Sequence, residues 1–282
     1  MATGFGCMVV GSAGSGKSTF CQVLQESGET HKRVYKVCNL DPAAEVFKYK
    51  CDIDIRDLIS LDDVQEELKY GPNGGLIYCM EYLIEHIDWL MEELNEFAED
   101  SFILFDCPGQ IELYSHLDVM TRLTRELSKT GFFICAVYCA DGTFINEPTK
   151  YISACFTSLS TMTQLSIPHI NILTKCDKMD PELIEKVTNM PTIEILNSIN
   201  SNLPPKFYEL NTRIVEVIDN FNMVQYVPLN IQDEESIDTI MQQIDSVVQY
   251  DEFRLPKESL LPNDDGNEDD QEDGDGGDME QY

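Results

Sequence analysis

The strongest constraint on the fold comes from residues 11–18, Gly-Ser-Ala-Gly-Ser-Gly-Lys-Ser, which directly follow the apolar run Cys-Met-Val-Val. They match G-x-x-x-x-G-K-[ST] at every position, and a phosphate-binding loop of this kind lies between a buried strand and a helix. Its glycines let backbone N–H groups surround phosphates, and the helix that follows turns its positive end toward them. The pattern therefore predicts a strand, a phosphate loop and a helix near the start of an α/β domain.

Two side chains of this loop have predicted roles of their own. Lys17 would reach the β- and γ-phosphates of a nucleotide, and the hydroxyl of Ser18 would bind Mg²⁺. The residues expected to contact the nucleotide here are Gly11, Ser12, Ala13, Gly14, Ser15, Gly16, Lys17, Ser18 and Thr19.

Six short apolar runs are typical of strands buried on both faces of a sheet, because they are unbroken rather than alternating. Helical patterns separate them, so we expect repeated β-α-β units and a doubly wound, mostly parallel sheet flanked by helices. The expected strands are residues 7–11, 34–40, 102–106, 133–141, 169–175 and 224–230.

The rest of the chain divides into helices and a tail. Apolar residues recur at three and four between Gly74 and Phe97, which predicts one amphipathic helix. A helical insertion is expected over about 181–222, inside a single domain of residues 1–255. Residues 256–282 include ten acidic and no basic residues from Asp264 onward, so we expect a disordered tail. It would keep the chain soluble or dock a basic partner.

The charge of the chain excludes several classes of function. Nineteen basic residues against 51 acidic ones give a formal net charge of −32, which disfavours direct binding to nucleic acid or to anionic membranes.

The longest apolar run, 132–140, is too short to cross a bilayer. Ten cysteines are scattered without C-x-x-C or zinc spacing, so we expect a reduced, cytoplasmic protein and leave shuttling to the nucleus open.

A second nucleotide motif is predicted at 106–110, Asp-Cys-Pro-Gly-Gln, which follows an expected strand. Asp106 would hold Mg²⁺, the backbone N–H of Gly109 would approach a γ-phosphate, and Gln110 could position water. Alone, the same residues also suit an ordinary turn at the end of a strand.

A third motif, Thr-Lys-Cys-Asp at 174–177, follows another expected strand. The carboxylate of Asp177 can accept two hydrogen bonds from guanine, whereas adenine offers no such pair of donors, and the stem of Lys175 would cover the base. Thr174 stands where Asn is more familiar. Pro228 and Leu229 suit a base-contacting loop, although that stretch also fits a strand-to-helix turn capped by Asp233.

Two further stretches lie beside these motifs. Asp41 ends the second expected strand, where its carboxylate could orient or deprotonate the attacking water or bind Mg²⁺, but it also fits a turn before Pro42. Gly71-Pro72-Asn73 begins a predicted helix, and Asn73 is a candidate N-cap. Because Pro72 stiffens the backbone, Asn73 could also present its amide to a phosphate at a fixed place.

Together these stretches resemble the GPN-loop GTPases. The resemblance is carried by "GSAGSGKST", "NLDPAAE", "GPNGGLIYCMEY", "FDCPGQIELYSH" and "TKCD", which occur in the family's order over roughly residues 5–250. "NLDPAAE", "DIRDLI" and "SVVQYDE" look most like the third of the family's paralogues, and "CFTSLSTM" is also similar to the second.

This resemblance implies a P-loop fold, Mg²⁺-dependent hydrolysis of GTP to GDP, and a homodimer or a heterodimer with the first paralogue. It also implies that Gly71, Pro72 and Asn73 enter the partner's active site. The implied cellular role is assembly and nuclear import of RNA polymerase II, through its subunits or assembly factors. The residues alone leave two alternatives, a nucleotide-dependent chaperone or binding module and a P-loop nucleotide kinase.

Overall fold

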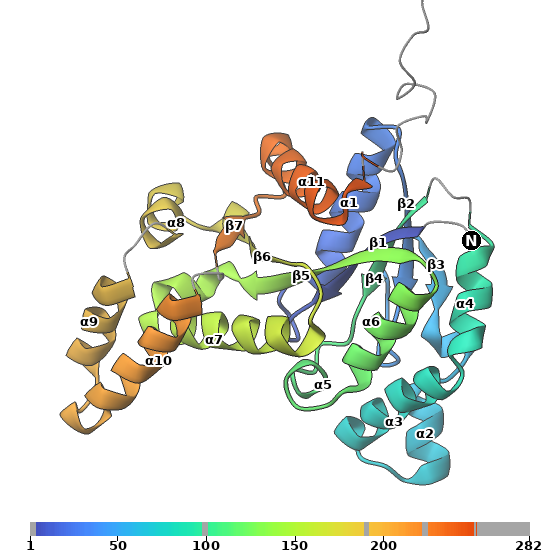
Figure 1. The fold of residues 1–282 in the computed structure, drawn as a ribbon, viewed down its shortest axis with the longest axis horizontal. Helices are drawn as coiled ribbons and strands as arrows, with labels where there is room; N and C mark the ends of the chain where they lie inside the picture. Colours follow the sequence, from blue (N-terminus) through green and yellow to red (C-terminus); the bar gives the residue numbers. More distant parts are fainter. Residues whose placement is uncertain (1–3, 98–100, 189–191, 222–224, 251, 253–282) are drawn as a thin grey trace, which may run out of the picture.

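The computed structural model describes residues 4–97, 101–188, 192–221, 225–250 and 252, so the predicted tail at 256–282 lies outside the described residues. Within these ranges seven strands form one sheet, and every pair of neighbouring strands is parallel (Figure 1). The strands are β1 (Gly4–Val10), β2 (Val34–Asn39), β3 (Cys51–Asp54), β4 (Ser101–Asp106), β5 (Phe132–Asp141), β6 (His169–Thr174) and β7 (Tyr226–Pro228).

Helices connect nearly all of these strands. The α-helices are α1 (Lys17–Thr30), α2 (Leu61–Leu68), α3 (Pro72–Glu85), α4 (Ile87–Asn95), α5 (Glu112–Ser115), α6 (Val119–Lys129), α7 (Pro148–Leu165), α8 (Pro181–Thr188), α9 (Thr192–Asn202), α10 (Tyr208–Phe221) and α11 (Glu234–Val248). Short 3₁₀ turns are η1 (Ile55–Asp57), η2 (Gly142–Asn146), η3 (Cys176–Lys178) and η4 (Pro205–Phe207).

The strand order β3-β2-β4-β1-β5-β6-β7 confirms the predicted doubly wound sheet. From β1 the chain runs outward to β2 and β3, returns to β4 beside β1, and then builds β5, β6 and β7 on the other side. Asp106 at the end of β4 is level with Val9 of β1 and Asn39 of β2. The ends of three parallel strands therefore meet at one edge of the sheet, next to the phosphate loop.

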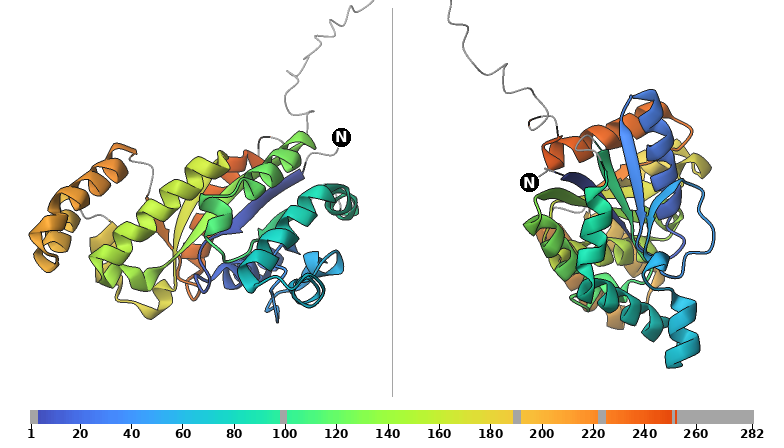
Figure 2. Two further views of the ribbon diagram at one scale, coloured as in Figure 1. Left: turned by 90° about the horizontal axis from the view of Figure 1, so that it is seen from below. Right: turned by 90° about the vertical axis from the view of Figure 1, so that its right-hand side faces the viewer.

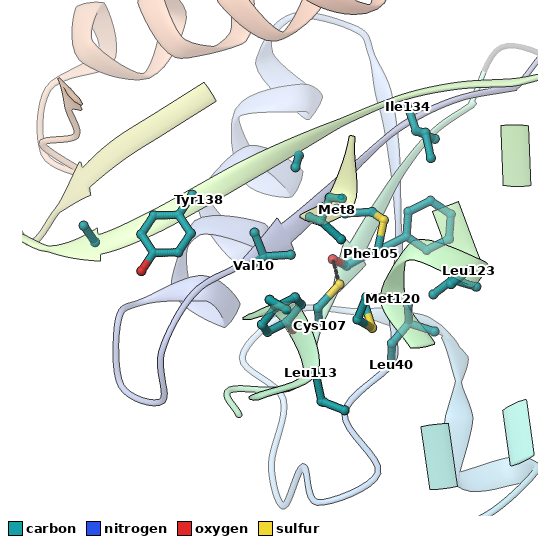
Figure 3. Packing of buried hydrophobic residues seen from close by; sticks show 14 of the residues in the cluster. Met8, Val10, Leu40, Phe105, Cys107, Leu113, Met120, Leu123, Ile134 and Tyr138 are labelled. Atoms are coloured by element: carbon teal, nitrogen blue, oxygen red, sulfur yellow. Dashed lines mark hydrogen bonds between the residues drawn. The ribbon is translucent and has the colours of Figure 1, made fainter. Parts of the chain in front are cut away.

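Two helical layers cover the sheet. Helices α1 and α11 pack on one face, and α3, α6 and α7 lie on the other (Figures 1 and 2). On the second face, Met8, Phe105, Cys107 and Met120 are fully buried and pack together beneath the strand ends (Figure 3). This dense packing gives the loops above it a rigid base.

The strand β3 was not among the six predicted strands. Its sequence alternates Cys51, Asp52, Ile53 and Asp54, and only Ile53 is buried. An edge strand has one open side and tolerates charged side chains. The search for unbroken apolar runs therefore could not find it.

The prediction of one helix from Gly74 to Phe97 was wrong. The chain forms α3 and α4, and His86 lies between them with φ −113° and ψ 35°. The His86 Nδ1 atom lies 2.9 Å from the Tyr82 carbonyl oxygen, and the His86 ring stacks on the Tyr82 ring. The His86 N–H still donates to the Tyr82 carbonyl oxygen over 3.0 Å, so α3 ends at this residue, and the break lets Leu83 and Leu90 both reach the core.

The stretch predicted as a helical insertion contains α8, α9 and α10. Helices α9 and α10 pack on each other and on α7 and lie at one end of the molecule (Figure 2). All ten cysteines have free thiols, and all but Cys51 are buried. In the described part of the chain, no helix is long and apolar enough to cross a membrane.

Candidate functional site

The phosphate loop forms the bend between β1 and α1. Gly11, Gly14 and Gly16 have φ of 140°, 74° and 95°, which side chains rarely tolerate. A Cβ atom on Gly11 would lie 2.4 Å from the carbonyl oxygen of Cys139. The glycines are therefore required by the backbone path.

Lys17 begins α1 and is nearly buried, with 8% of its surface exposed. Its ammonium group donates a hydrogen bond to the Ser12 carbonyl oxygen over 3.2 Å, which places the positive charge across the loop. With the first N–H groups of α1 nearby, this region attracts anions.

Asp106 is only 3% exposed, and two hydroxyl groups bind its carboxylate. Tyr49 donates to Asp106 Oδ2 over 2.9 Å, and Ser18 donates as well. Burial nevertheless raises the pKa of Asp106, because these bonds and the charge of Lys17 do not fully offset desolvation. A buried carboxylate next to a hydroxyl is a set of hard oxygen donors suited to Mg²⁺, whose charge would supply the missing compensation.

Asp41 is held in a well-defined turn after β2. The Asn39 side chain accepts from the Asp41 N–H over 3.0 Å and donates to the Asp41 carbonyl oxygen over 3.1 Å, while Asp41 Oδ1 accepts from the Ala43 N–H. Asn39 also donates to Asp54, which forms a bidentate pair with Arg56. These contacts hold the backbone that presents the Asp41 carboxylate.

The loop after β4 lies directly against the phosphate loop. A Cβ atom on Gly109 would lie 2.8 Å from the Ala13 Cα atom, so only glycine fits at this distance. The Gln110 Oε1 atom is buried and has no hydrogen-bond partner in the described structure. A buried acceptor without a partner is costly, which suits an amide that orients a bound molecule.

One cleft of about 970 Å³ gathers the predicted phosphate-side residues. Its lining includes Ser12, Ala13, Gly14, Lys17, Ser18, Asp41, Asp106, Gly109 and Gln110, and also Pro72 and Asn73 from the start of α3. Asn73 is exposed and lies on the rim of its own chain's cleft.

The prediction that Asn73 caps α3 was wrong. The N-cap is Gly71, Pro72 is the first helical residue, and no side chain caps the end. Proline suits the first helical position because its φ is fixed and its missing N–H would have no helical partner there. The Asn73 amide is consequently not engaged as a cap.

The base-side motif lies beside this cleft and is tied to it by Thr174. The Thr174 hydroxyl lies 2.6 Å from the Ser15 carbonyl oxygen and 2.9 Å from that of Ala140. Lys175 pairs with Asp141 over 2.6 Å. Burial alone would raise the pKa of Asp141, but bonds from Lys175 and Thr143 hold it below its usual value.

The residues predicted to contact the base are close together in the backbone. The Leu229 N–H donates to Leu173, and the Leu229 carbonyl oxygen accepts from Cys176, so the loop at Pro228 lies against the Thr-Lys-Cys-Asp loop. Asp177 is half-exposed and is the middle residue of η3. Asp233 caps α11, accepting from the Glu235 N–H, which confirms the alternative expectation of a capped strand-to-helix turn.

Sequence reasoning missed a supporting layer around these motifs. Tyr49 binds Asp106, Arg56 donates to the Ala44 carbonyl oxygen over 2.7 Å, and Asp141 pairs with the base-side lysine. The repeated acids and the arginine of Asp-Ile-Asp-Ile-Arg-Asp at 52–57 were a usable signal. Nothing local marked Tyr49.

Comparisons with known proteins identify related chains. The profile of a family described as "Conserved hypothetical ATP binding protein" matches residues 9–250. "GPN-loop GTPase 3" of Dictyostelium discoideum is 44% identical over 91% of both chains. The protein of the same name from Saccharomyces cerevisiae is 42% identical over 92% of this chain and 96% of its own.

A solved structure is also similar. A GTPase from Pyrococcus abyssi, solved in its apo form, aligns with a TM-score of 0.72, covering 88% of this chain and 98% of its own. At 22% identity, this likeness shows the fold alone. The sequence relatives, however, match nearly the whole chain at more than 40% identity, and the chain therefore belongs to the GPN-loop GTPase family.

Proposed function

We propose that this protein binds GTP and hydrolyses its β–γ phosphoanhydride bond, releasing GDP and phosphate. The observation that carries the proposal is one cleft in which Lys17, Asp41, Asp106 and Gln110 meet at the ends of three neighbouring strands. Phosphoryl transfer depends mainly on positioning and on charge stabilisation, and this set of side chains supplies both.

Each of these residues has a distinct part in the reaction. Lys17 and the N–H groups of the phosphate loop hold the β- and γ-phosphates. Asp41 and Gln110 orient the attacking water, with Asp41 also able to accept its proton. The turn that Asn39 stabilises keeps the Asp41 carboxylate in place.

Mg²⁺ is the expected metal, and Ser18 and Asp106 would hold it, with Asp41 as a further oxygen donor. The ion would neutralise charge on the β- and γ-phosphate oxygens. The contact between Ser18 and Asp106 keeps these oxygen donors together.

Selectivity for guanine is assigned to Asp177, with Lys175 beside the base and the Pro228–Leu229 backbone closing the loop. The matching family is described as ATP-binding, whereas the sequence relatives are named GTPases. The carboxylate at 177 supports guanine, because only guanine offers two adjacent donors at that edge. The Thr174 hydroxyl donates to the Ser15 carbonyl oxygen and so ties the proposed base site to the backbone of the phosphate loop.

A dimer would complete the site. In this proposal Gly71, Pro72 and Asn73 enter the cleft of a partner, which is a second copy or the first paralogue of the family. Two observations support this. A Cβ added to Gly71 would meet nothing within 4 Å, and Asn73 is exposed and does not cap α3. The implied biology is assembly and nuclear import of RNA polymerase II by a cytoplasmic protein that shuttles to the nucleus.

One other function is favoured by a specific observation. Ile193 and Leu210 on α9 and α10 are 59% and 55% exposed, which suits a nucleotide-dependent binding module or chaperone in which hydrolysis is secondary. A nucleotide kinase is less well supported, because such an enzyme needs an arginine-rich lid and residues 181–222 contain only Arg213. Arg213 pairs with Glu216 on its own helix.

The test uses Asp41→Ala and Gln110→Ala. Both variants should still bind GTP and should lose phosphate release. Normal phosphate release from either variant would remove that residue from the mechanism. Variants that lose hydrolysis but still support the cellular role would favour the binding module.

A further inference from the structure

Tyr114 lies just after the second nucleotide motif, in α5, and the mechanism above does not use it. Its side chain is 1% exposed and packs in the core on the α6 side of the sheet. Its hydroxyl donates a hydrogen bond to the carbonyl oxygen of Pro108 over 2.5 Å. Burial raises the pKa of Tyr114 well above its usual value, so the phenol stays a neutral donor.

This bond fixes the direction of the next N–H group. No peptide bond among the described residues is cis, and in a trans peptide the C=O and N–H point in opposite directions. Since Tyr114 holds the Pro108 oxygen from the core side, the N–H of Gly109 points away from the core. Gly109 lines the cleft on that side, against Ala13.

The other hydrogen bonds of this loop do not involve the Pro108–Gly109 peptide, which is held by Tyr114. The Cys107 N–H donates to Val9 of β1, and the Gln110 carbonyl oxygen accepts from the Leu113 N–H. Pro108 has no N–H, and its ring limits φ. Among the described residues, no acceptor is recorded for the Gly109 N–H, so it is free to bind a ligand oxygen.

We propose that Tyr114 is a positioning residue for recognition of the γ-phosphate: by holding the Pro108–Gly109 peptide, it aims the Gly109 N–H at a nucleoside triphosphate and so separates the triphosphate from the diphosphate. This inference rests on the proposed GTP site. Without the Tyr114 hydroxyl, the Pro108–Gly109 peptide loses this buried hydrogen bond and can rotate. The Gly109 N–H then points at the γ-phosphate for a smaller fraction of the time. A diphosphate has no group at that place, and its affinity does not depend on Tyr114.

The test is Tyr114→Phe in the full-length protein, with Tyr35→Phe as the matched control. Both changes remove one oxygen from a buried ring, and Tyr35 lies on the opposite face of the sheet, 5% exposed. Calorimetry with Mg²⁺ would measure affinities for the β,γ-imido analogue of GTP and for GDP.

For Tyr114→Phe we expect the affinity for the triphosphate analogue to fall about tenfold, the scale of one hydrogen bond to a charged group, with GDP affinity unchanged. The control should change neither. Equal losses for both nucleotides would show that Tyr114 only packs the core, and unchanged affinities would show that the loop needs no anchor. Either result overturns the proposal.

A second measurement keeps the phenol and avoids any folding defect. With 3-fluorotyrosine placed at position 114, its ¹⁹F resonance should shift on adding the triphosphate analogue and not on adding GDP. A resonance that responds to neither, or equally to both, contradicts the proposal. If the wild type binds neither guanine nucleotide, the proposed function itself has failed. Binding by the wild type therefore separates failure of the proposed function from failure of the proposal for Tyr114.

Discussion

Replacing Gly109 with alanine should slow hydrolysis, because it disturbs two loops of the cleft, and should also lower stability. The new Cβ would lie 2.8 Å from the Ala13 Cα atom, about 0.6 Å short of the 3.4 Å at which ordinary contact begins. Backbone cannot turn aside as a flexible side chain can, so one of the two loops must move. Both loops carry groups that we assign to phosphate binding, so the movement would displace them from the proposed site of reaction.

The size of the effect can be worked out from this displacement. A misplacement of about 1 Å can cost about 10² in rate, so a shift of roughly 0.6 Å should lower kcat by about tenfold or more. Overpacking costs about 1–3 kcal/mol, which corresponds to a fall in Tm of roughly 2–10 °C for a chain of this size. Phosphate release under saturating GTP measures the first quantity, and thermal melting measures the second.

Two other glycines provide controls. Gly28→Ala would place a Cβ 2.5 Å from the Tyr35 ring and 2.7 Å from the Arg33 carbonyl oxygen, far from the cleft, and should lower Tm with little effect on kcat. Gly74→Ala meets nothing within 4 Å and lies inside α3, so it should raise stability by up to about 1 kcal/mol. A Gly109→Ala protein with wild-type kcat would refute the reasoning about the close approach of the loops.

Three further predictions concern the base, the dimer and pH. Asp177→Ala should bind GTP at least tenfold more weakly and lose its preference over ATP; retained preference in competition binding would place base recognition elsewhere. Asn73→Ala should bind GTP but hydrolyse it slowly, and mixing it with Lys17→Ala subunits should restore activity if Asn73 acts on the partner's nucleotide; no rescue at any ratio contradicts that geometry. Burial lowers the pKa of His169 to about 4, so the unfolded state binds more protons below about pH 6.5, and stability should fall by at most about 3 kcal/mol between pH 6.5 and 4. In urea titrations His169→Gln should flatten this slope; an unchanged slope in His169→Gln would reject the assignment.

The sequence could predict the elements whose signals are local. The phosphate loop is specified by glycines that the backbone requires, and the six predicted strands are specified by unbroken apolar runs. The edge strand β3 was missed because Asp52 and Asp54 interrupt its apolar pattern. The break at His86 lies within a continuous apolar pattern, so periodicity does not reveal it.

The supporting layer of the site could not be predicted because its contacts are distant in sequence. Tyr49 reaches Asp106 across 57 positions, and neither residue has a neighbour that points to the other. The anchor at Tyr114 is nearer to the motif, but its role depends on which way a single peptide faces. The motifs therefore indicate which groups react, and packing decides how they are held.

The most direct test of the account is nucleotide competition during hydrolysis by the purified wild-type protein. Phosphate release from GTP should require Mg²⁺, stop with a chelator and continue undiminished in the presence of a large excess of ATP. Equal hydrolysis of ATP would contradict the assignment of Asp177 to guanine. An absence of Mg²⁺-dependent phosphate release, from the single chain and from its mixture with the first paralogue, would contradict the assignment of the cleft to GTP hydrolysis.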